Sequence, residues 1–145
     1  MVGPPEFMTY EEPGGGTFFW YDGPSGAGPW ILWQQPHPLS FAEMAYRSNS
    51  SKRQEVLETY NQTVHDTADF MADFILQAPP TADGCYSLGP PMYTAEIESD
   101  QGRPAPVARD GTFELAYWSF GLSIASMWRE RQGLPPMDRW KSAER

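Results

Sequence analysis

The pattern of apolar and polar positions is clearest between residues 51 and 77. Apolar side chains recur there at spacings of three and four, which places them on one face of a helix. The residues on this face are Val56, Tyr60, Val64, Ala68, Met71 and Ile75. Pro79 and Pro80 end the helix, because proline supplies no amide donor and disfavours helical geometry in the residue before it. The pattern predicts an amphipathic helix that packs by one side.

A second long pattern, over residues 112–132, is apolar on nearly all sides. Glu114 is the only charged residue in all but its last turn, and a carboxylate in the first turn complements the positive end of a helix. Asp110 or Thr112 can cap the start of this helix, and Gly133 can stop its end. A helix that is apolar around its whole circumference is typical of a buried position. We therefore expect it to need neighbours on every side.

Shorter patterns flank these two helices. Residues 37–47 predict a helix entered through prolines, and residues 48–51 form a polar turn that can cap the helix that follows. Residues 137–143 predict a last, short helix, whereas residues 1–30 are rich in glycine and proline and are typical of loop. The sequence thus predicts an all-α fold of helical hairpins, joined by long loops rich in glycine, proline and aromatic residues.

A long loop over residues 78–110 separates the two long helices. Loops of about 30 residues are uncommon in compact domains and are often binding or active-site loops. Within this one, Glu96, Glu98 and Asp100 stand on alternating positions shortly after Met92. The loop is therefore a candidate active-site segment.

Composition and charge exclude several classes of partner. The chain has 145 residues, enough for one domain, and a net charge of −9 that argues against nucleic acid, whose phosphates need clustered cations. No apolar run approaches the length that spans a bilayer, so we expect no membrane partner. The single Cys85 allows no internal disulfide and the N-terminus lacks the features of a signal peptide, so we expect a cytoplasmic protein. His37, His65 and Cys85 form no zinc pattern, and we expect no metal and no cofactor.

Three segments carry a resemblance to a known family. They read GPWILWQQPHPLSFAEMAYR from Gly28, LGPPMYTAE from Leu88 and TFELAYWSFGLSIASMWRERQGLP from Thr112. With the amphipathic helix among them, they resemble consecutive segments of the six-hairpin glycosidases, whose catalytic domain is an (α/α)6 barrel. The resemblance covers about residues 25–140. Within that superfamily the chain is similar to glycoside hydrolase family 65 and its uncharacterised relatives.

This resemblance implies both a fold and an activity. Because such barrels are longer than this chain, it implies that residues 1–145 form a single partial (α/α)6 glycosidase-like domain, which fits the need of the apolar helix for further neighbours. It implies a carbohydrate-active enzyme that cleaves glycosidic bonds of an oligosaccharide or glycoside substrate, by hydrolysis or phosphorolysis. We expect the isolated chain to be inactive and to self-associate through the exposed barrel interior.

The resemblance directs attention to the acidic loop. Cleavage of a glycosidic bond needs one carboxylic acid to protonate the leaving oxygen and a second carboxylate as base or nucleophile. In family 65 a glutamate directly before the tyrosine of this loop is the general acid, but Met92 precedes Tyr93 here, so that role does not carry over. Glu96 is the nearest catalytic candidate and Glu98 the second. The alternative is a solvated acidic loop without chemistry.

A second candidate site precedes the first helix. Trp33, Gln34 and Gln35 combine a flat ring, which can stack on the C–H face of a sugar, with amides that bond its hydroxyls, and Tyr93 in the loop is a further candidate. Core packing is the alternative for these residues. His37, between two prolines, is expected to act as a structural cap. A rival function is a non-catalytic helical interaction or carbohydrate-binding module, for which the amphipathic helix and acidic surface suffice.

Overall fold

The computed structural model describes residues 31–89, 92 and 109–144. The regular elements in these ranges are all helical, which confirms the expected all-α class for this part of the chain. They are η3 (Leu32–Gln34), α1 (His37–Ser48), η4 (Ser50–Lys52), α2 (Arg53–Leu76), α3 (Thr112–Arg131) and α4 (Asp138–Ala143). Residues 1–30 and most of the candidate loop, with Tyr93, Glu96 and Glu98, lie outside the described residues. Within the described ranges, no helix has both the length and the apolar character needed to cross a membrane.

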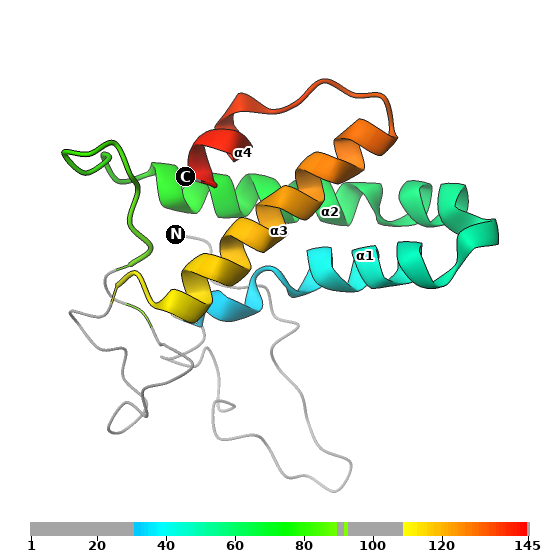
Figure 1. The fold of residues 1–145 in the computed structure, drawn as a ribbon, viewed down its shortest axis with the longest axis horizontal. Helices are drawn as coiled ribbons and strands as arrows, with labels where there is room; N and C mark the ends of the chain where they lie inside the picture. Colours follow the sequence, from blue (N-terminus) through cyan, green and yellow to red (C-terminus); the bar gives the residue numbers. More distant parts are fainter. Residues whose placement is uncertain (1–30, 90–91, 93–108, 145) are drawn as a thin grey trace, which may run out of the picture.

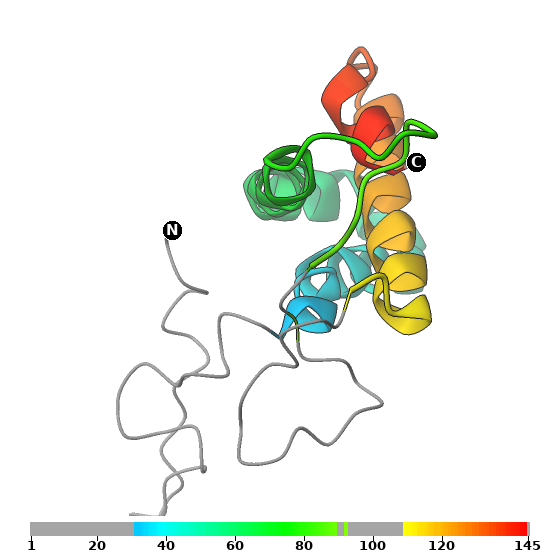
Figure 2. The ribbon, with the colours of Figure 1, turned by 90° about the vertical axis from the view of Figure 1, so that its left-hand side faces the viewer.

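The helices pack as two antiparallel neighbours with a third across them. α1 and α2 run side by side in opposite directions, joined by η4, and α3 crosses both of them (Figure 1). Figure 2 shows α3 standing at one side of α1 and α2, with the short α4 beside the end of α3. α4 contacts both α2 and α3. The core of the described residues lies where these helices meet.

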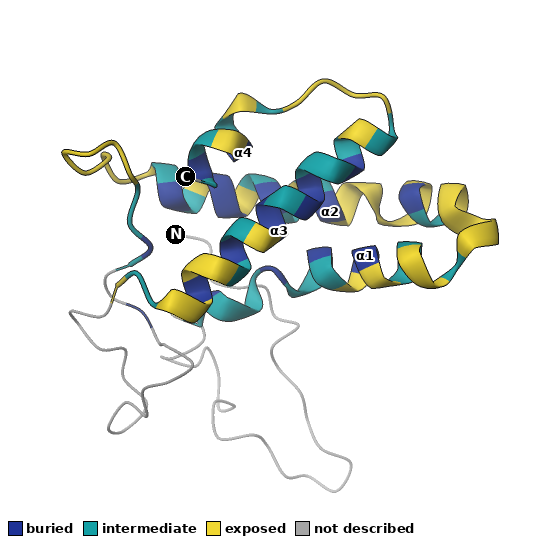
Figure 3. Ribbon diagram, in the orientation of Figure 1, coloured by how far each residue is buried: buried dark blue, intermediate teal, exposed yellow. Residues whose placement is uncertain are grey.

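The buried face of α2 differs slightly from the predicted one. The buried residues of this helix are Leu57, Val64, Ala68, Met71, Ala72 and Ile75. Leu57 and Val64 are seven residues apart, close to two full turns, so they point in nearly the same direction. Tyr60 lies on the flank of this line and is 40 % exposed, so its assignment to the buried face was wrong. Figure 3 shows the same stripe of buried positions along α2, with exposed positions around it.

The helices of the described residues cover α3 only in part, although its apolar pattern led us to expect that it needs neighbours on every side. One face is in the core, where its Trp118, Leu122 and Trp128 are buried. The opposite side leaves Phe113 43 % and Phe120 47 % exposed. The physical reason is that α1, α2 and α4 cover one side of α3 only (Figure 2).

Gly121 lets α3 approach the start of α1 closely. A Cβ atom at position 121 would lie 2.9 Å from Cβ of Pro36 and 3.1 Å from Cδ1 of Leu39. The first distance is shorter than side-chain carbons adopt, so any larger residue would push the helices apart. The absent side chain therefore fixes the close crossing of α3 over the first turn of α1.

The helix ends follow the sequence only in part. Gly133, at φ 68°, stops α3: its N–H donates to the carbonyl of Glu130 at 3.0 Å, and the N–H of Leu134 to that of Arg129 at 2.9 Å. The predicted caps at the starts are wrong, because neither α2 nor α3 has a side-chain cap. The Asp110 carboxylate accepts instead from the backbone N–H of Leu88 at 2.8 Å.

A buried carboxylate joins α1 to the end of α3. Glu43 is 4 % exposed, and its oxygens accept from Arg131 at 2.5 and 2.9 Å. They also accept from Nε1 of Trp128 at 3.0 Å and Nε of Arg47 at 2.6 Å. Burial opposes the charged form, but the hydrogen bonds from Arg131, Arg47 and Trp128 outweigh it and lower the pKa of Glu43 to about 2.

Candidate functional site

The η3 turn is fixed to α3 through its first residue. Leu32 is 2 % exposed, and its carbonyl oxygen accepts a hydrogen bond from Nε1 of Trp118 at 2.7 Å. The N–H of Gln35 donates to the same carbonyl at 3.1 Å and closes the turn. Because Leu32 turns inward, Trp33, Gln34 and Gln35 lie half-buried at the edge of the core.

Trp33 lies against other rings at this edge. Its ring meets that of His37 edge-on at a centroid distance of 5.8 Å, and that of Phe113 in the same manner at 6.5 Å. Trp33 does not belong to the buried core cluster. Neither Gln34 nor Gln35 makes a side-chain hydrogen bond to another described residue. Trp33 is therefore a half-buried residue outside the core, and the two residues after it have amide groups without a hydrogen bond to another described residue.

The rings around Trp33 form one continuous surface, which we call the aromatic face. It consists of Trp33, His37, Phe41, Phe113, Tyr117 and Phe120. The first three follow η3 and α1 at intervals of four, and the others follow α3 at intervals of four and three, so each set lies along one side of its helix. The two rows meet through the contacts of Trp33 with Phe113 and of His37 with Tyr117. Figure 1 shows the start of α3 near the start of α1.

His37 and Tyr117 join the two rows by a hydrogen bond. Nδ1 of His37 lies 2.8 Å from the hydroxyl oxygen of Tyr117, and the ring centroids are 5.5 Å apart. Burial lowers the pKa of His37 below its ordinary value, so the imidazole is neutral at neutral pH. The expected role of His37 as a helix cap is wrong, because α1 has no side-chain cap and the imidazole bonds α3 instead.

The sequence did not mark Tyr117 as a functional residue, because it stands among the many apolar residues of a helix that was expected to be buried. The signal that could have found it is its spacing. Phe113, Tyr117 and Phe120 repeat at intervals of four and three on a side of α3 that Trp118 and Leu122 do not occupy. The partner, His37, is 80 residues away in the chain, which no local pattern can show.

The described ends of the candidate loop are tied together at the start of α3. The N–H of Asp110 donates to the carbonyl of Leu88 at 2.9 Å, while the Asp110 carboxylate accepts from the N–H of Leu88. Met92 is completely buried and belongs to the core. Figures 1 and 2 show the loop up to Gly89, the start of α3 and the start of α1 at one end of the helices. Glu96 and Glu98 remain predictions.

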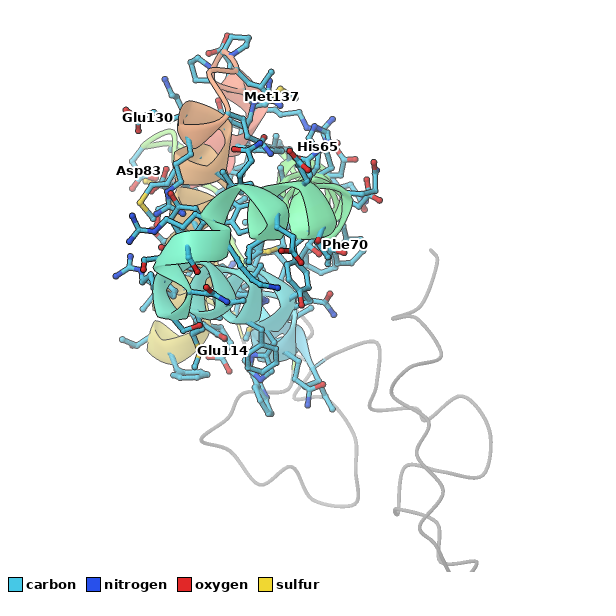
Figure 4. The ribbon with its side chains drawn as sticks, turned by 90° about the vertical axis from the view of Figure 1, so that its right-hand side faces the viewer. His65, Phe70, Asp83, Glu114, Glu130 and Met137 are labelled. Atoms are coloured by element: carbon cyan, nitrogen blue, oxygen red, sulfur yellow. The ribbon has the colours of Figure 1, made fainter. Side chains whose placement is uncertain are left out.

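Glu114 is a second buried carboxylate, at the same end of the helices. It is 1 % exposed in the first turn of α3, and Figure 4 marks it near the start of that helix, far from Glu130 at the other end. Its position in the first turn is the one where the helix dipole favours a negative charge.

A separate pocket of about 310 Å³ lies between α2, α3 and α4. Its lining residues are Ile75, Tyr86, Leu88, Leu115, Ala116, Trp118, Ser119, Ala143 and Glu144. The lining is mainly apolar, and none of the residues predicted for catalysis or sugar binding belongs to it. The pocket and the aromatic face are therefore different surfaces of the described structure.

Neither a metal site nor a similarity to known proteins narrows the choice of function for the described residues. Among the described residues, no group of three or more His, Cys, Asp or Glu side chains is placed to hold a metal ion. Comparison with protein-family models, curated proteins and solved structures gives no match. Any functional interpretation must therefore come from the residues themselves.

Proposed function

We propose that the chain is part of an (α/α)6 glycosidase-like domain that acts on glycosidic bonds and binds its sugar on Trp33, Gln34 and Gln35. The observation that carries this proposal is the half-buried Trp33 ring, which lies outside the core and is followed in the chain by two half-buried glutamines. Aromatic rings stack on the C–H faces of sugars, and amides offer both a donor and an acceptor to hydroxyl groups. The site thus has the chemistry that a neutral sugar ring requires.

The second support is that the two described ends of the candidate loop, at Leu88 and Asp110, are joined at the start of the helix that contacts this site. The pair formed by Leu88 and Asp110 leads directly into α3, whose second residue, Phe113, contacts Trp33. Glu96 follows the buried Met92 by four residues, which span at most about 14 Å of chain. In the proposal Glu96 is the general acid, Glu98 is the second choice, and Tyr93 lines the sugar site. The second carboxylate of the reaction comes from Glu98 or from another part of the domain.

Loss of sugar binding on removal of the Trp33 ring tests the proposal. We expect Trp33→Ala to weaken the binding of a glucose oligosaccharide about tenfold, the factor that corresponds to roughly 1.4 kcal/mol of lost contact. The melting temperature should change little, because Trp33 is outside the core, whereas loss of a buried tryptophan costs about 3–5 kcal/mol. Tyr60→Ala is the matched control, because Tyr60 is an exposed ring on α2. A large fall in stability with unchanged binding would instead make Trp33 a packing residue.

A second candidate function is a helical interaction module. The observation that favours it is the exposure of two apolar side chains on α1, since Phe41 is 62 % and Met44 64 % exposed. Contiguous apolar surface of this kind often marks a protein interface. The two functions differ in one measurable property, because an interaction module has no need to bind a sugar.

A further inference from the structure

We propose that the hydrogen-bonded pair of His37 and Tyr117 is the polar centre of the sugar-binding surface, and that it selects uncharged sugars. The inference rests on the proposed function and adds to it the residues that recognise the ligand hydroxyls. Neither residue belongs to the set that the sequence assigned to the sugar.

The first argument is the position of the pair within the aromatic face. Trp33, Phe41 and Phe113 lie around it, and Tyr117 stacks on Phe120 at a centroid distance of 6.3 Å. A face that served packing alone could use rings without polar atoms, whereas here a hydroxyl and an imidazole lie among the rings. A sugar needs the opposite arrangement, with polar atoms between flat apolar surfaces.

The second argument concerns which atoms of the pair carry the protons. A neutral imidazole has one donor nitrogen and one acceptor nitrogen. A phenol hydroxyl is the better donor of the two groups, so we assign the proton of Tyr117 to the bond with Nδ1 of His37. Nε2 then carries the imidazole proton, and it makes no hydrogen bond to another described residue. In the proposal Nε2 donates to a sugar oxygen, while the Tyr117 oxygen accepts from a sugar hydroxyl.

The third argument is charge, which decides the class of sugar. None of the six described side chains that form the aromatic face carries a positive charge, because its histidine is neutral. The chain as a whole carries a net charge of −9, which repels anions at long range. A uronic acid or a phosphorylated sugar would therefore lose its water at these six side chains without meeting a cation among them. The face is suited to neutral sugars.

Substitutions that remove single polar atoms test the proposal on the whole chain. We expect Tyr117→Phe and His37→Phe each to weaken the binding of an α-linked or β-linked glucose disaccharide about 3- to 10-fold, the range of one hydrogen bond. The double variant should lose little more than either single variant, because the two residues act as one unit. Tyr86→Phe is the matched control, because it removes a tyrosine hydroxyl from the separate pocket and should leave the affinity unchanged.

Two further measurements distinguish sugar recognition by the pair from a purely structural role. Nitrogen NMR of His37 should show Nε2 responding to the disaccharide and Nδ1 keeping its bond to Tyr117, a response that a packing role would not give. In a titration with the single sugars, glucuronic acid should bind at least about tenfold more weakly than glucose.

The outcomes distinguish this inference from the function on which it rests. Disaccharide binding that is lost in Trp33→Ala but unchanged in both Tyr117→Phe and His37→Phe overturns the role of the pair and leaves the proposed function standing. Glucuronic acid that binds as tightly as glucose overturns the selection for uncharged sugars. Failure of the unaltered chain to bind either disaccharide overturns both the inference and the proposed function.

Discussion

Arg131 binds Glu43 through both of its terminal nitrogens, at 2.5 and 2.9 Å, and so joins the last turn of α3 to the middle of α1. The same guanidinium lies over the ring of Tyr46, 4.1 Å from its centroid. This arrangement ties the last turn of α3 to α1, whereas His37 and Tyr117 join α1 to an earlier part of α3. The ion pair and the pair of His37 and Tyr117 are thus two separate side-chain links between α1 and α3.

Removal of the Glu43 charge should destabilise the fold. Glu43→Gln leaves the Arg131 guanidinium partly buried without its charged partner, and breaking a buried ion pair in this way costs about 3–5 kcal/mol. Denaturant unfolding of both proteins measures the difference. Glu55→Gln is the control, since the exposed pair of Glu55 with Lys52 should contribute at most about 1 kcal/mol.

The same carboxylate makes stability depend on acid pH. Because folding lowers the pKa of Glu43 from 4.5 to about 2, its contribution is fully present above pH 4.5 and is lost as the pH falls toward 2. Unfolding measured from pH 6 to pH 2 should therefore show a decline that is smaller in Glu43→Gln. Equal pH dependence in both proteins would mean that Glu43 does not carry the effect.

A methyl group at position 121 should separate α3 from α1. Gly121→Ala places a carbon 2.9 Å from Cβ of Pro36, and over-packing of this kind costs about 1–3 kcal/mol even though alanine favours helix. Thermal unfolding should show a lower melting temperature than that of Ser126→Ala on the same helix. A rise in melting temperature would show that the crossing tolerates the extra carbon.

The helix bounds were predictable from sequence, whereas the site was predictable only in part. Proline, glycine and local spacing define where helices begin and end, and Gly133 ends α3 as expected. Burial of a given side depends on which helices cover it, so local spacing could not show that Phe120 is exposed. The pair of His37 and Tyr117 joins residues 80 apart, and such contacts follow from packing alone. The sequence left open whether Trp33 packs in the core or contacts a sugar, and only the structure shows that it is half-buried.

The acidic loop should carry the chemistry when the whole proposed domain is present. Glu96→Gln in a protein that contains the full barrel should lose most of its rate, because general acid catalysis contributes roughly 10²–10⁴-fold. Hydrolysis or phosphorolysis of a glucose disaccharide measures this, with Glu98→Gln assayed beside it. Full activity in both variants would remove the loop carboxylates from the mechanism.

The isolated 145-residue chain should self-associate and lack glycosidase activity. Phe41, Met44 and Phe120 leave apolar surface exposed on α1 and α3, and such surface favours association. Light scattering should show a mass that rises with concentration, and a hydrophobic dye should bind. A compact monomer that binds no dye would argue for a self-contained interaction module and against a partial barrel.

The most direct measurement for the sugar site is chemical-shift mapping by NMR during titration with a glucose disaccharide. The proposal predicts that the largest shifts occur at the indole N–H of Trp33 and the side-chain amides of Gln34 and Gln35. The hydroxyl-bearing residues of the separate pocket, Tyr86 and Ser119, should not respond. Shifts confined to that pocket, or no shifts up to the highest soluble sugar concentration, would contradict a carbohydrate site on the aromatic face.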